Sequence, residues 1–326
     1  MGNRFMVGID IGGTSIKMGL LTPSGSMVGK LEQPTLVELG ADSVIQRTAE
    51  MVELLLQRSD VAKHQLAGIG IGVPGPIDAD SGVVHQAVNL HWQRTELRAK
   101  MEALTGVRVF VENDANAAAL GEMWQGAGTG ATNLVMITLG TGVGGGIIVN
   151  GAITHGINGV AGEIGHITVD PTHGPLCNCG KRGCLENYAS ATGIIRAGRE
   201  AAENGQSYVL ADILSEHNKL TAKDVIDAAK AGDPGATSVI DQATYYLGLA
   251  FSHLIVLLNP AKIVVGGGVS ASGPFLFDKI REVCQRFVPF PQAFASCDIL
   301  PATLGNDAGI IGAAWLVRAH AWQSVT

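Results

Sequence analysis

The sequence predicts an α/β protein built from two related lobes. Two segments, 5–21 and 135–149, each consist of an apolar strand, a glycine turn and a second strand, which is the pattern of a hairpin. Apolar runs typical of strands alternate along the chain with segments of helical periodicity, as in α/β proteins. Gly12-Gly13-Thr14 in the first hairpin corresponds to Gly140-Thr141-Gly142 in the second. We therefore expect two similar lobes that face one central cleft.

The elements of the first lobe follow in order after its hairpin. They are a helix at 43–58, a strand at 67–73 that ends in Pro74-Gly75-Pro76, and a strand at 107–111. The segment Glu112-Asn-Asp-Ala-Asn comes next, and Asn113-Asp114 should begin a helix, because Asn and Asp are preferred at that position. We expect this lobe to comprise residues 1–113 and 307–326, with the last helix packed on it.

The second lobe is expected at 114–306 and should be mainly helical after the cysteine-rich segment. Helices should begin near Thr192, Thr221 and Asp233, and a strand at 262–265 should lead into Gly266-Gly267-Gly268. The longest apolar stretch, 245–258, predicts a buried helix that ends at Asn259-Pro260. That stretch is too short to span a bilayer.

The composition describes a well-buried globular chain and argues against several classes of protein. Of the 326 residues, 46% are hydrophobic and only 16% are charged. A formal charge of −7 offers no basic surface for phosphate backbones, so we expect no nucleic-acid partner. Five cysteines are an odd number and no signal peptide precedes the first strand, so we do not expect a disulfide framework. We expect a cytoplasmic protein without a membrane partner.

A cluster of metal-binding residue types follows the second hairpin. It consists of Glu163-Ile-Gly-His166 and then Cys177-Asn-Cys-Gly-Lys-Arg-Gly-Cys-Leu-Glu186. Three thiolates and one imidazole complete the tetrahedral shell that Zn²⁺ prefers, and such a closed shell leaves no position for a catalytic water. We therefore predict a structural Zn²⁺ held by His166, Cys177, Cys179 and Cys184. Two alternatives stay open: the cysteines form a reduced surface loop, or His173 takes the place of His166.

The glycine turns suit phosphate binding, although each turn alone is weak evidence. A Gly-Gly-Thr turn between two strands presents free backbone amides and a hydroxyl to an anion. A tight hairpin without a ligand could have the same sequence, and the Walker pattern is absent. Two further glycine segments, Val265-Gly-Gly-Gly-Val269 and Leu304-Gly-Asn-Asp-Ala-Gly309, make coincidence a poor explanation.

Several of these motifs stand together in one protein family. They are Asp10-Ile-Gly-Gly-Thr14 with Lys17, Pro74-Gly75-Pro76, Glu112-Asn-Asp-Ala-Asn116, Leu139-Gly-Thr-Gly142, Glu163-Ile-Gly-His166, and the segment from Cys177 to Glu186. Over essentially its whole length the chain resembles the ROK family of sugar kinases and repressors, which has the actin-like ATPase fold. Residues 185–193 and the helical insertion after them are most similar to the glucokinases of Gram-positive bacteria.

The resemblance implies a catalytic base and a set of sugar-binding residues. Asp114 is the predicted base: it follows a strand end, it begins a helix, and Asn113 beside it can hold a hydroxyl. Its position at the helix start should favour the ionised carboxylate. The alternative is that Asp114 only caps the helix.

Sugar hydroxyls are expected to bind to Glu163 and Glu186, by resemblance to the matching positions of the family. The alternative for these two residues is a pair of solvated surface acids. One ring nitrogen of His166 on the zinc would leave the other free to donate to a sugar hydroxyl. Gly75 would let the backbone of the first lobe reach the sugar.

The resemblance also implies binding sites for ATP and Mg²⁺. Asp10 matches the family's acidic residue near the magnesium and phosphates. The triphosphate loops correspond to Gly12, Gly13, Thr14, Thr141 and Gly142, and the adenosine side corresponds to Gly266, Gly267 and Gly268. Lys17 either pairs with phosphate or is a solvated charge.

These assignments predict an ATP-dependent glucokinase that phosphorylates the 6-hydroxyl of glucose. A kinase for N-acetylmannosamine or another hexose would use the same residues. A sugar-responsive repressor of the same family would need a helix-turn-helix, and only Met1 to Arg4 precede the first strand. Apolar helices around Tyr245 and the resemblance suggest a homodimer or homotetramer.

Overall fold

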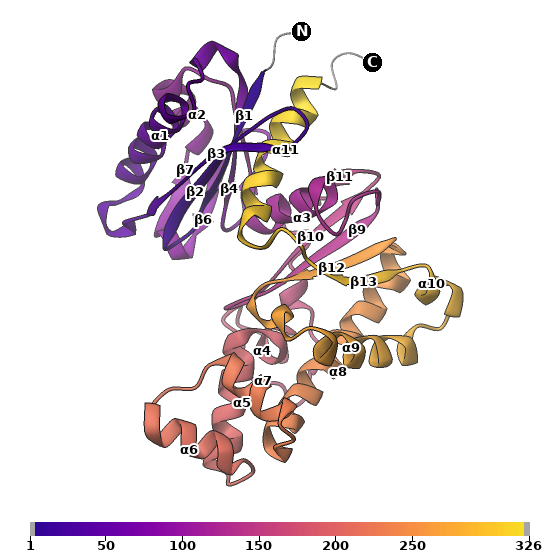
Figure 1. Cartoon of the computed structure of the whole chain (residues 1–326). Helices are drawn as coiled ribbons and strands as arrows, with labels where there is room; N and C mark the ends of the chain where they lie inside the picture. Colours follow the sequence, from indigo (N-terminus) through magenta and orange to yellow (C-terminus); the bar gives the residue numbers. More distant parts are fainter. Residues whose placement is uncertain (1–3, 323–326) are drawn as a thin grey trace. The chain divides into compact units, whose positions relative to one another are not determined.

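A computed structural model describes residues 4–322 of the chain (Figure 1). The chain divides into two compact units. Unit 1 comprises residues 1–132, 146–162 and 303–326, and unit 2 comprises residues 133–145 and 163–302. Compared with the lobes expected from the sequence, unit 1 additionally contains the helix that begins at Asp114 and the segment 146–162.

The sheet of unit 1 has the strand order β3-β2-β1-β4-β8. Its strands are β1 (Phe5–Ile11), β2 (Ser15–Leu21), β3 (Met27–Pro34), β4 (Leu66–Val73) and β8 (Val109–Asn113). β1 and β2 pair antiparallel, so the predicted first hairpin is confirmed. β1, β4 and β8 are parallel, and therefore the carboxyl ends of β1 and β8, with Asp10 and Asn113, lie at the same edge of the sheet.

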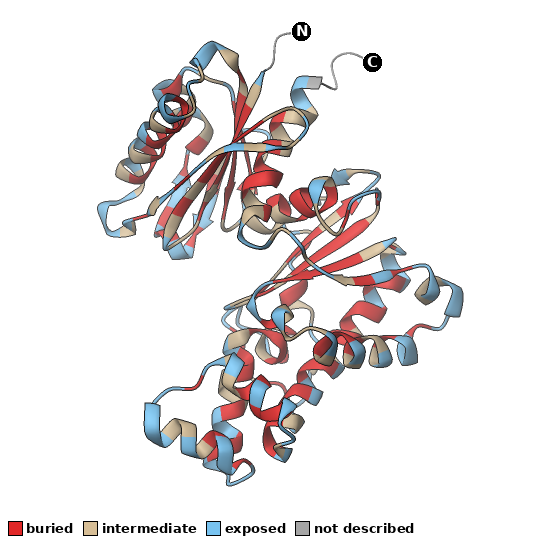
Figure 2. Ribbon diagram, in the orientation of Figure 1, coloured by how far each residue is buried: buried red, intermediate tan, exposed pale blue. Residues whose placement is uncertain are grey.

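Helices cover both faces of this sheet. The helices of unit 1 are α1 (Ala41–Arg58), α2 (Leu97–Thr105), α3 (Asp114–Gln125) and α11 (Ala308–Trp322). α1 and α2 pack on the face that carries Val7 and Ile9, and α11 packs on the opposite face, which carries Met6. β1, β2, β4 and β8 are mostly buried, whereas β3 at the sheet edge is not (Figure 2). A small antiparallel sheet completes the unit, with β5 (Ile77–Asp78), β6 (Val83–Ala87) and β7 (Trp92–Thr95).

Glycine allows α11 to lie directly against its neighbours. A Cβ at Gly8 or Gly70, in the sheet, would overlap the backbone of α11. A Cβ at Gly312 in α11 would overlap the carbonyl oxygen of Ala117 in α3, and a Cβ at Gly121 in α3 would overlap that of Ala308. α3 is therefore held in unit 1 by backbone-to-backbone packing on α11.

We expect Gly312→Ala to destabilise unit 1, because the added methyl group would push α3 and α11 apart. Overpacking of this kind costs about 1 to 3 kcal/mol. Thermal unfolding followed by circular dichroism should show a lower melting temperature. A melting temperature equal to that of the wild type would show that the two helices do not pack this closely.

The second five-stranded sheet has the order β11-β10-β9-β12-β13. Its strands are β9 (Leu134–Leu139), β10 (Val143–Val149), β11 (Ala152–Ile153), β12 (Lys262–Gly266) and β13 (Asp298–Pro301). β9 and β10 are neighbours, as expected for the second glycine hairpin. The division between the two units falls inside β10, between Gly145 and Gly146.

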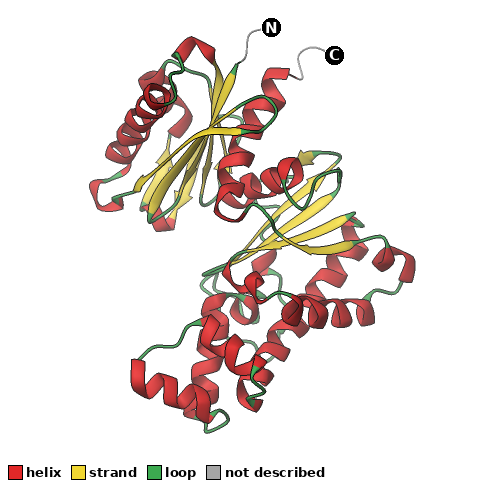
Figure 3. Ribbon diagram, viewed as in Figure 1, coloured by secondary structure: helices red, strands yellow, loops and turns green. Residues whose placement is uncertain are grey.

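Unit 2 is mainly helical after the cysteine-rich segment (Figure 3). Its helices are α4 (Glu186–Ala189), α5 (Ala191–Glu203), α6 (Tyr208–His217), α7 (Ala222–Lys230), α8 (Pro234–Leu258), α9 (Pro274–Phe287) and α10 (Pro291–Ala295). The side chains of Thr221 and Asp233 cap α7 and α8, which confirms two of the predicted helix starts. α8 ends at Asn259 in the left-handed conformation. Among the described residues, no helix is long and apolar enough to cross a membrane.

Short 3₁₀ helices occur in both units. They are η1 (Val37–Leu39), η2 (Lys63–Gln65), η3 (Val88–Leu90), η4 (Ile164–His166), η5 (Gly268–Ser272) and η6 (Gly305–Asp307). Two of them carry predicted site residues, because η4 contains His166 and η5 begins at Gly268. Both of these helices belong to unit 2.

Candidate active site and metal centre

Asn113 and Asp114 lie where β8 ends and α3 begins. The Asn113 Oδ1 accepts hydrogen bonds from the amides of Ala115 (2.9 Å) and Asn116 (3.2 Å), so Asn113 is the residue that caps the helix. Asp114 is the first residue of α3, and its Oδ1 also accepts from the Ala115 amide, at 2.9 Å. Since Asn113 already supplies the cap, helix capping alone does not account for Asp114.

Burial changes the acid–base properties of Asp114. It raises the pKa of the Asp114 carboxyl above its usual value, and the Ala115 amide and the Asn113 side chain oppose this effect by donating hydrogen bonds. We expected the helix start to favour the ionised form. That effect is present, but removal from water outweighs it. The raised pKa makes the carboxylate a stronger base than an exposed aspartate.

Asp10 is a second half-buried acid at the same edge of the sheet. Burial raises its pKa to about 6, repulsion by Asp114 adds to the rise, and the charge of Lys17 opposes it. Lys17 is the cross-strand partner of Asp10 in the β1–β2 hairpin. α11 also packs closely here, because a Cβ at Gly309 would lie 3.1 Å from the Asp10 carboxyl.

We expect Asp10→Asn to stabilise the Mg²⁺-free protein above neutral pH. Since the folded-state pKa of Asp10 is raised, its contribution to stability is fully present below the ordinary pKa of 3.8 and is lost as the pH rises through about 6. A neutral side chain avoids that loss, which is at most about 3 kcal/mol. Urea denaturation of the variant and the wild type at pH 5 and pH 8 measures this difference in the free energy of unfolding. A variant that is less stable than the wild type at pH 8 would contradict the buried-charge argument.

The glycine turn between β1 and β2 is supported by Thr35. The buried Thr35 hydroxyl donates to the Gly12 carbonyl oxygen (2.6 Å), and the Thr35 amide donates to the Thr14 carbonyl oxygen (3.0 Å). The Gly12 amide donates to the Ser15 carbonyl oxygen at 3.0 Å, so it is used to close the turn. The expectation of free amides is therefore wrong for Gly12.

Gly75 has a conformation that requires glycine. Its φ is 95°, and a Cβ there would overlap the Gln86 carbonyl oxygen. The Gly75 carbonyl oxygen accepts a hydrogen bond from the Asn113 Nδ2 at 3.2 Å. The structure thus joins the loop after β4 to the residue that precedes Asp114.

In unit 2, the predicted sugar-binding residues gather around Val143, the first residue of β10. The Glu186 Oε2 accepts a hydrogen bond from the Val143 amide at 3.1 Å, and a Cβ at Gly142 would overlap that oxygen. A Cβ at Gly165, between Glu163 and His166, would overlap the Val143 carbonyl oxygen. The start of α4 and the 3₁₀ helix η4 therefore both contact the backbone of Val143. The side chain of Glu163 is exposed and that of Glu186 is half-buried.

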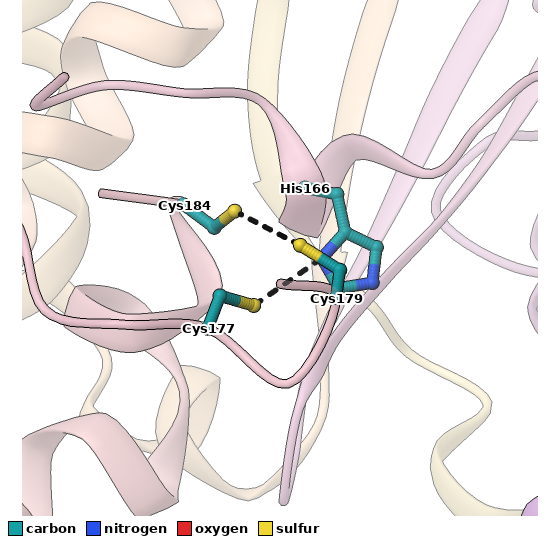
Figure 4. A group of neighbouring side chains, drawn as sticks. All are labelled: His166, Cys177, Cys179 and Cys184. Carbon is teal, nitrogen blue, oxygen red and sulfur yellow. Dashed lines mark hydrogen bonds between the residues drawn. The ribbon is translucent and has the colours of Figure 1, made fainter. Parts of the chain in front are cut away.

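The four predicted metal ligands converge. The ligand atoms of His166, Cys177, Cys179 and Cys184 all lie within 4.8 Å of one another (Figure 4). The Cys177 Sγ lies 3.6 Å from the His166 Nδ1, and the Cys179 and Cys184 sulfurs lie 3.6 Å apart. A tetrahedral zinc shell with bonds of 2.0 to 2.3 Å has edges of about 3.5 to 3.8 Å, so the donor set fits Zn²⁺. His173 is not part of the cluster.

The cysteine loop is fastened to the helices beside it. The Asp170 carboxylate accepts from the hydroxyls of Tyr188 (2.8 Å) and Tyr246 (3.3 Å), which belong to α4 and α8. The two tyrosine rings lie 4.2 Å apart. The Lys181 Nζ donates to the His166 carbonyl oxygen at 2.9 Å. These contacts hold the loop in the shape that brings the thiols to His166.

A cavity of about 500 Å³ in unit 2 joins two predicted nucleotide motifs. Thr141 lines it from the turn after β9, and Gly268 lines it from the start of η5. Gly267 has a φ of 87°, and a Cβ there would overlap the Leu139 carbonyl oxygen, so this backbone passes close to β9. The remaining wall comes from α5, α7 and η5, with Ala191, Ala222, Lys223, Ile226, Asp227, Lys230, Val269, Ala271 and Ser272.

Comparison with known proteins decides the family. The family model described as the ROK family matches residues 6–320 of this chain. The protein belongs to the ROK family. This ROK protein is 49% identical to the glucokinase of Halalkalibacterium halodurans, over 98% of the chain and 96% of that protein. It is 39% identical to the glucokinase of Thermotoga maritima, over 96% of the chain and 97% of that protein.

A solved structure shows how far the fold is shared. The ROK family glucokinase from Streptomyces griseus, solved in complex with glucose and AMPPNP, matches this ROK protein with a TM-score of 0.79 and 35% identity. The match covers 96% of the chain and 99% of that structure's chain. The predicted α/β class and the actin-like ATPase fold of the ROK family are thereby confirmed.

The sequence interpretation missed two groups of residues in this ROK protein. The first is the wall that α7 gives to the cavity, although the helix itself was expected to begin near Thr221. The second is a pair between Glu112 and His155, which lie in separate parts of unit 1. A carboxylate at the end of a buried strand was the only signal in the sequence for that pair.

Proposed function

We propose that the chain is an ATP-dependent glucokinase that transfers the γ-phosphoryl group of ATP to the 6-hydroxyl of glucose. The support is of two kinds. Two glucokinases match it along nearly their whole length, and a ROK family glucokinase with glucose and an ATP analogue shares its fold. The observation that carries the proposal is the Asp114 carboxyl, which is half-buried, has a raised pKa, and is not the residue that caps α3.

Asp114 acts as the general base. As the oxygen of the 6-hydroxyl bonds to the γ-phosphorus, the O–H bond breaks and its proton passes to the Asp114 carboxylate. The bond between the γ-phosphorus and the oxygen that bridges to the β-phosphorus breaks, and ADP leaves with that electron pair. Because burial raises the pKa of Asp114, its carboxylate accepts the proton more readily than an exposed one.

The sugar is oriented by carboxylates and by one imidazole. Glu163 and Glu186 accept hydrogen bonds from ring hydroxyls, and a carboxylate with two oxygens can take two neighbouring hydroxyls. The His166 Nδ1 faces the thiols, so its Nε2 is the nitrogen that donates to the sugar. Asn113 and the backbone of Gly75, both in unit 1, are the further sugar contacts that we propose from the resemblance to the family.

The nucleotide is held by the glycine turns and by the cavity of unit 2. Gly13, Thr14, Thr141 and Gly142 hold the phosphates through backbone amides and hydroxyls, and Gly12 shapes its turn, because its own amide donates to the Ser15 carbonyl oxygen. The cavity beside Gly266, Gly267 and Gly268 takes the adenosine. Asp10 is the carboxylate placed to hold Mg²⁺, which neutralises phosphate charge when bound, and Lys17 adds a positive charge near Asp10.

The metal centre has a structural role in this proposal. His166 and the three cysteines would hold Zn²⁺, which would fix the orientation of the imidazole and close the loop that precedes Glu186. Four protein ligands leave no open position for chemistry. We also propose a cytoplasmic location and a homodimer or homotetramer, both from the sequence.

A coupled assay with a panel of sugars tests the proposed activity. Formation of ADP is measured with glucose, mannose, fructose and N-acetylmannosamine, each with ATP and Mg²⁺. Glucose should give the highest kcat/KM, because the full-length relatives are glucokinases. If only N-acetylmannosamine is phosphorylated, the substrate assignment is wrong although the reaction class stands.

Filling the cavity of unit 2 should weaken ATP binding selectively. Ala222 is half-buried at the start of α7 and lines the cavity. We expect Ala222→Trp to raise the KM for ATP about tenfold, because the indole takes the space of the base, and to leave the KM for glucose within about twofold. Ala222→Ser is the matched control and should behave as the wild type. An unchanged KM for ATP in the tryptophan variant would place the adenosine elsewhere.

A further inference from the structure

A buried carboxylate precedes Asn113 and Asp114. Glu112 is the last but one residue of β8 and is 2% exposed. Its Oε1 accepts hydrogen bonds from the Asn113 amide (2.9 Å) and from the Asn116 Nδ2 (3.0 Å), and its Oε2 lies 2.7 Å from the His155 Nε2. Removing a carboxylate from water is costly unless it is paired and hydrogen-bonded. Glu112 therefore depends on His155, the cationic partner that the structure gives it.

His155 is held in place by the fold of its own segment. It follows β11, and the amide of the preceding Thr154 donates to the Ile147 carbonyl oxygen at 2.8 Å. The Ala161 amide donates to the His155 carbonyl oxygen at 3.1 Å, which closes the segment into a loop. The side chain is 36% exposed and lies between two cavities of about 680 and 300 Å³. Its hydrogen bond to Glu112 connects this loop to the start of α3, because Glu112 also accepts from Asn116.

A series of hydrogen bonds connects the His155 imidazole to the residues around the proposed base, Asp114. His155 fixes one oxygen of Glu112, and the other oxygen of Glu112 fixes the backbone of Asn113 and the side chain of Asn116. Asn113 directly precedes Asp114, and Asn116 follows it by two positions in the first turn of α3. We propose that His155 is a positioning residue for phosphoryl transfer: acting through Glu112, it holds the Asp114 carboxylate in the orientation that receives the hydroxyl proton. This inference rests on the proposed role of Asp114.

Electrostatics agree with a pair of opposite charges. The hydrogen bond that the His155 ring donates to the Glu112 carboxylate raises the pKa of His155 above its usual value, and the charge of Asp80 adds to the rise. His155 therefore carries its imidazolium charge at lower pH and loses it as the pH rises through that raised pKa. The other titratable residues that line the two cavities are Asp78, Asp80, His85, Arg98 and His320.

The test compares His155→Ala with His155→Gln, because a glutamine amide can donate to Glu112 from nearly the same place. We expect the alanine variant to lose about tenfold to a hundredfold in kcat, since a small displacement of a reacting group is costly, while the KM for ATP changes by less than about twofold. We expect the kcat of the wild type to decline at high pH as His155 loses its charge. The glutamine variant should keep kcat within about threefold and should lack that decline.

Two further variants make the outcome specific. His85→Ala removes another histidine of the larger cavity, one that does not contact Glu112, and should leave kcat unchanged. In a double-mutant cycle, Glu112→Gln combined with His155→Ala should be no worse than the poorer single variant, because the two residues act as one unit. Independent, additive losses would overturn the proposal.

The result can be separated from a failure of the proposed base. A wild-type kcat in a folded His155→Ala variant overturns the positioning role, even if Asp114→Asn is inactive. Near-normal kcat in Asp114→Asn instead refutes the base itself. If His155→Ala does not fold, the glutamine variant decides: a folded protein with the wild-type decline of kcat at high pH would also overturn the inference.

Discussion

Replacing Asp114 by Asn should abolish turnover while leaving a folded protein that still binds glucose. The amide keeps the shape of the side chain and its contact with the Ala115 amide, but it cannot accept the hydroxyl proton. General-base groups contribute about 10² to 10⁴-fold, so we expect kcat to fall by that factor. Steady-state kinetics measure kcat, and isothermal titration measures glucose affinity, which should stay within a few-fold of the wild type.

Asp42 provides a matched control for this exchange. It is also an aspartate in the first turn of a helix, α1, but it is exposed and pairs with Lys100. Asp42→Asn should leave kcat unchanged. If Asp114→Asn retained more than about a tenth of the wild-type kcat, another group would have to receive the proton.

Loss of the metal should have the second large effect, on stability and activity together. Cys184 is fully buried and its sulfur lies 3.6 Å from that of Cys179. We expect Cys184→Ser to remove the zinc, lower the melting temperature and abolish activity, because binding a structural zinc contributes directly to folding free energy. Metal content by mass spectrometry and thermal unfolding measure the first two effects.

Two control substitutions, outside the metal cluster, distinguish loss of the metal from the general effect of replacing a cysteine or a histidine. Cys284 is equally buried but lies outside the cluster, so Cys284→Ala should keep one zinc per chain. His173→Ala should also keep the zinc, whereas His166→Ala should lose it. Retention of full metal content in Cys184→Ser would show that the cluster does not bind zinc.

Local signals in the sequence predicted the elements well. Thr221 and Asp233 mark helix starts because their side chains satisfy amides at the first turn, and that chemistry involves only neighbouring residues. The glycine turn at 12–14 was also predictable, because a tight turn between two strands is likewise determined by neighbouring residues. The metal ligands lie close in sequence, so their spacing already limited how they could meet.

Contacts between distant segments were less predictable. The placement of α3 in unit 1 depends on Gly121 and Gly312, which let two helix backbones touch, and no periodic pattern reports this. The pairing of Glu112 with His155 joins a strand end to a loop after another sheet. The raised pKa of Asp114 results from its removal from water by the surrounding fold, and the motif around Asp114 does not predict that removal.

The three-part construction of unit 1 has a consequence for synthesis on the ribosome. The amides of Thr303 and Leu304 donate to the buried carboxylate of Glu122 in α3, at 2.9 and 2.8 Å, and α11 follows directly. Until α11 has left the ribosome, the sheet of unit 1 has one uncovered apolar face, the face that carries Met6. The domain that carries Asp114 therefore matures only after unit 2 has been translated, and chaperone contact during that interval should centre on the face later covered by α11.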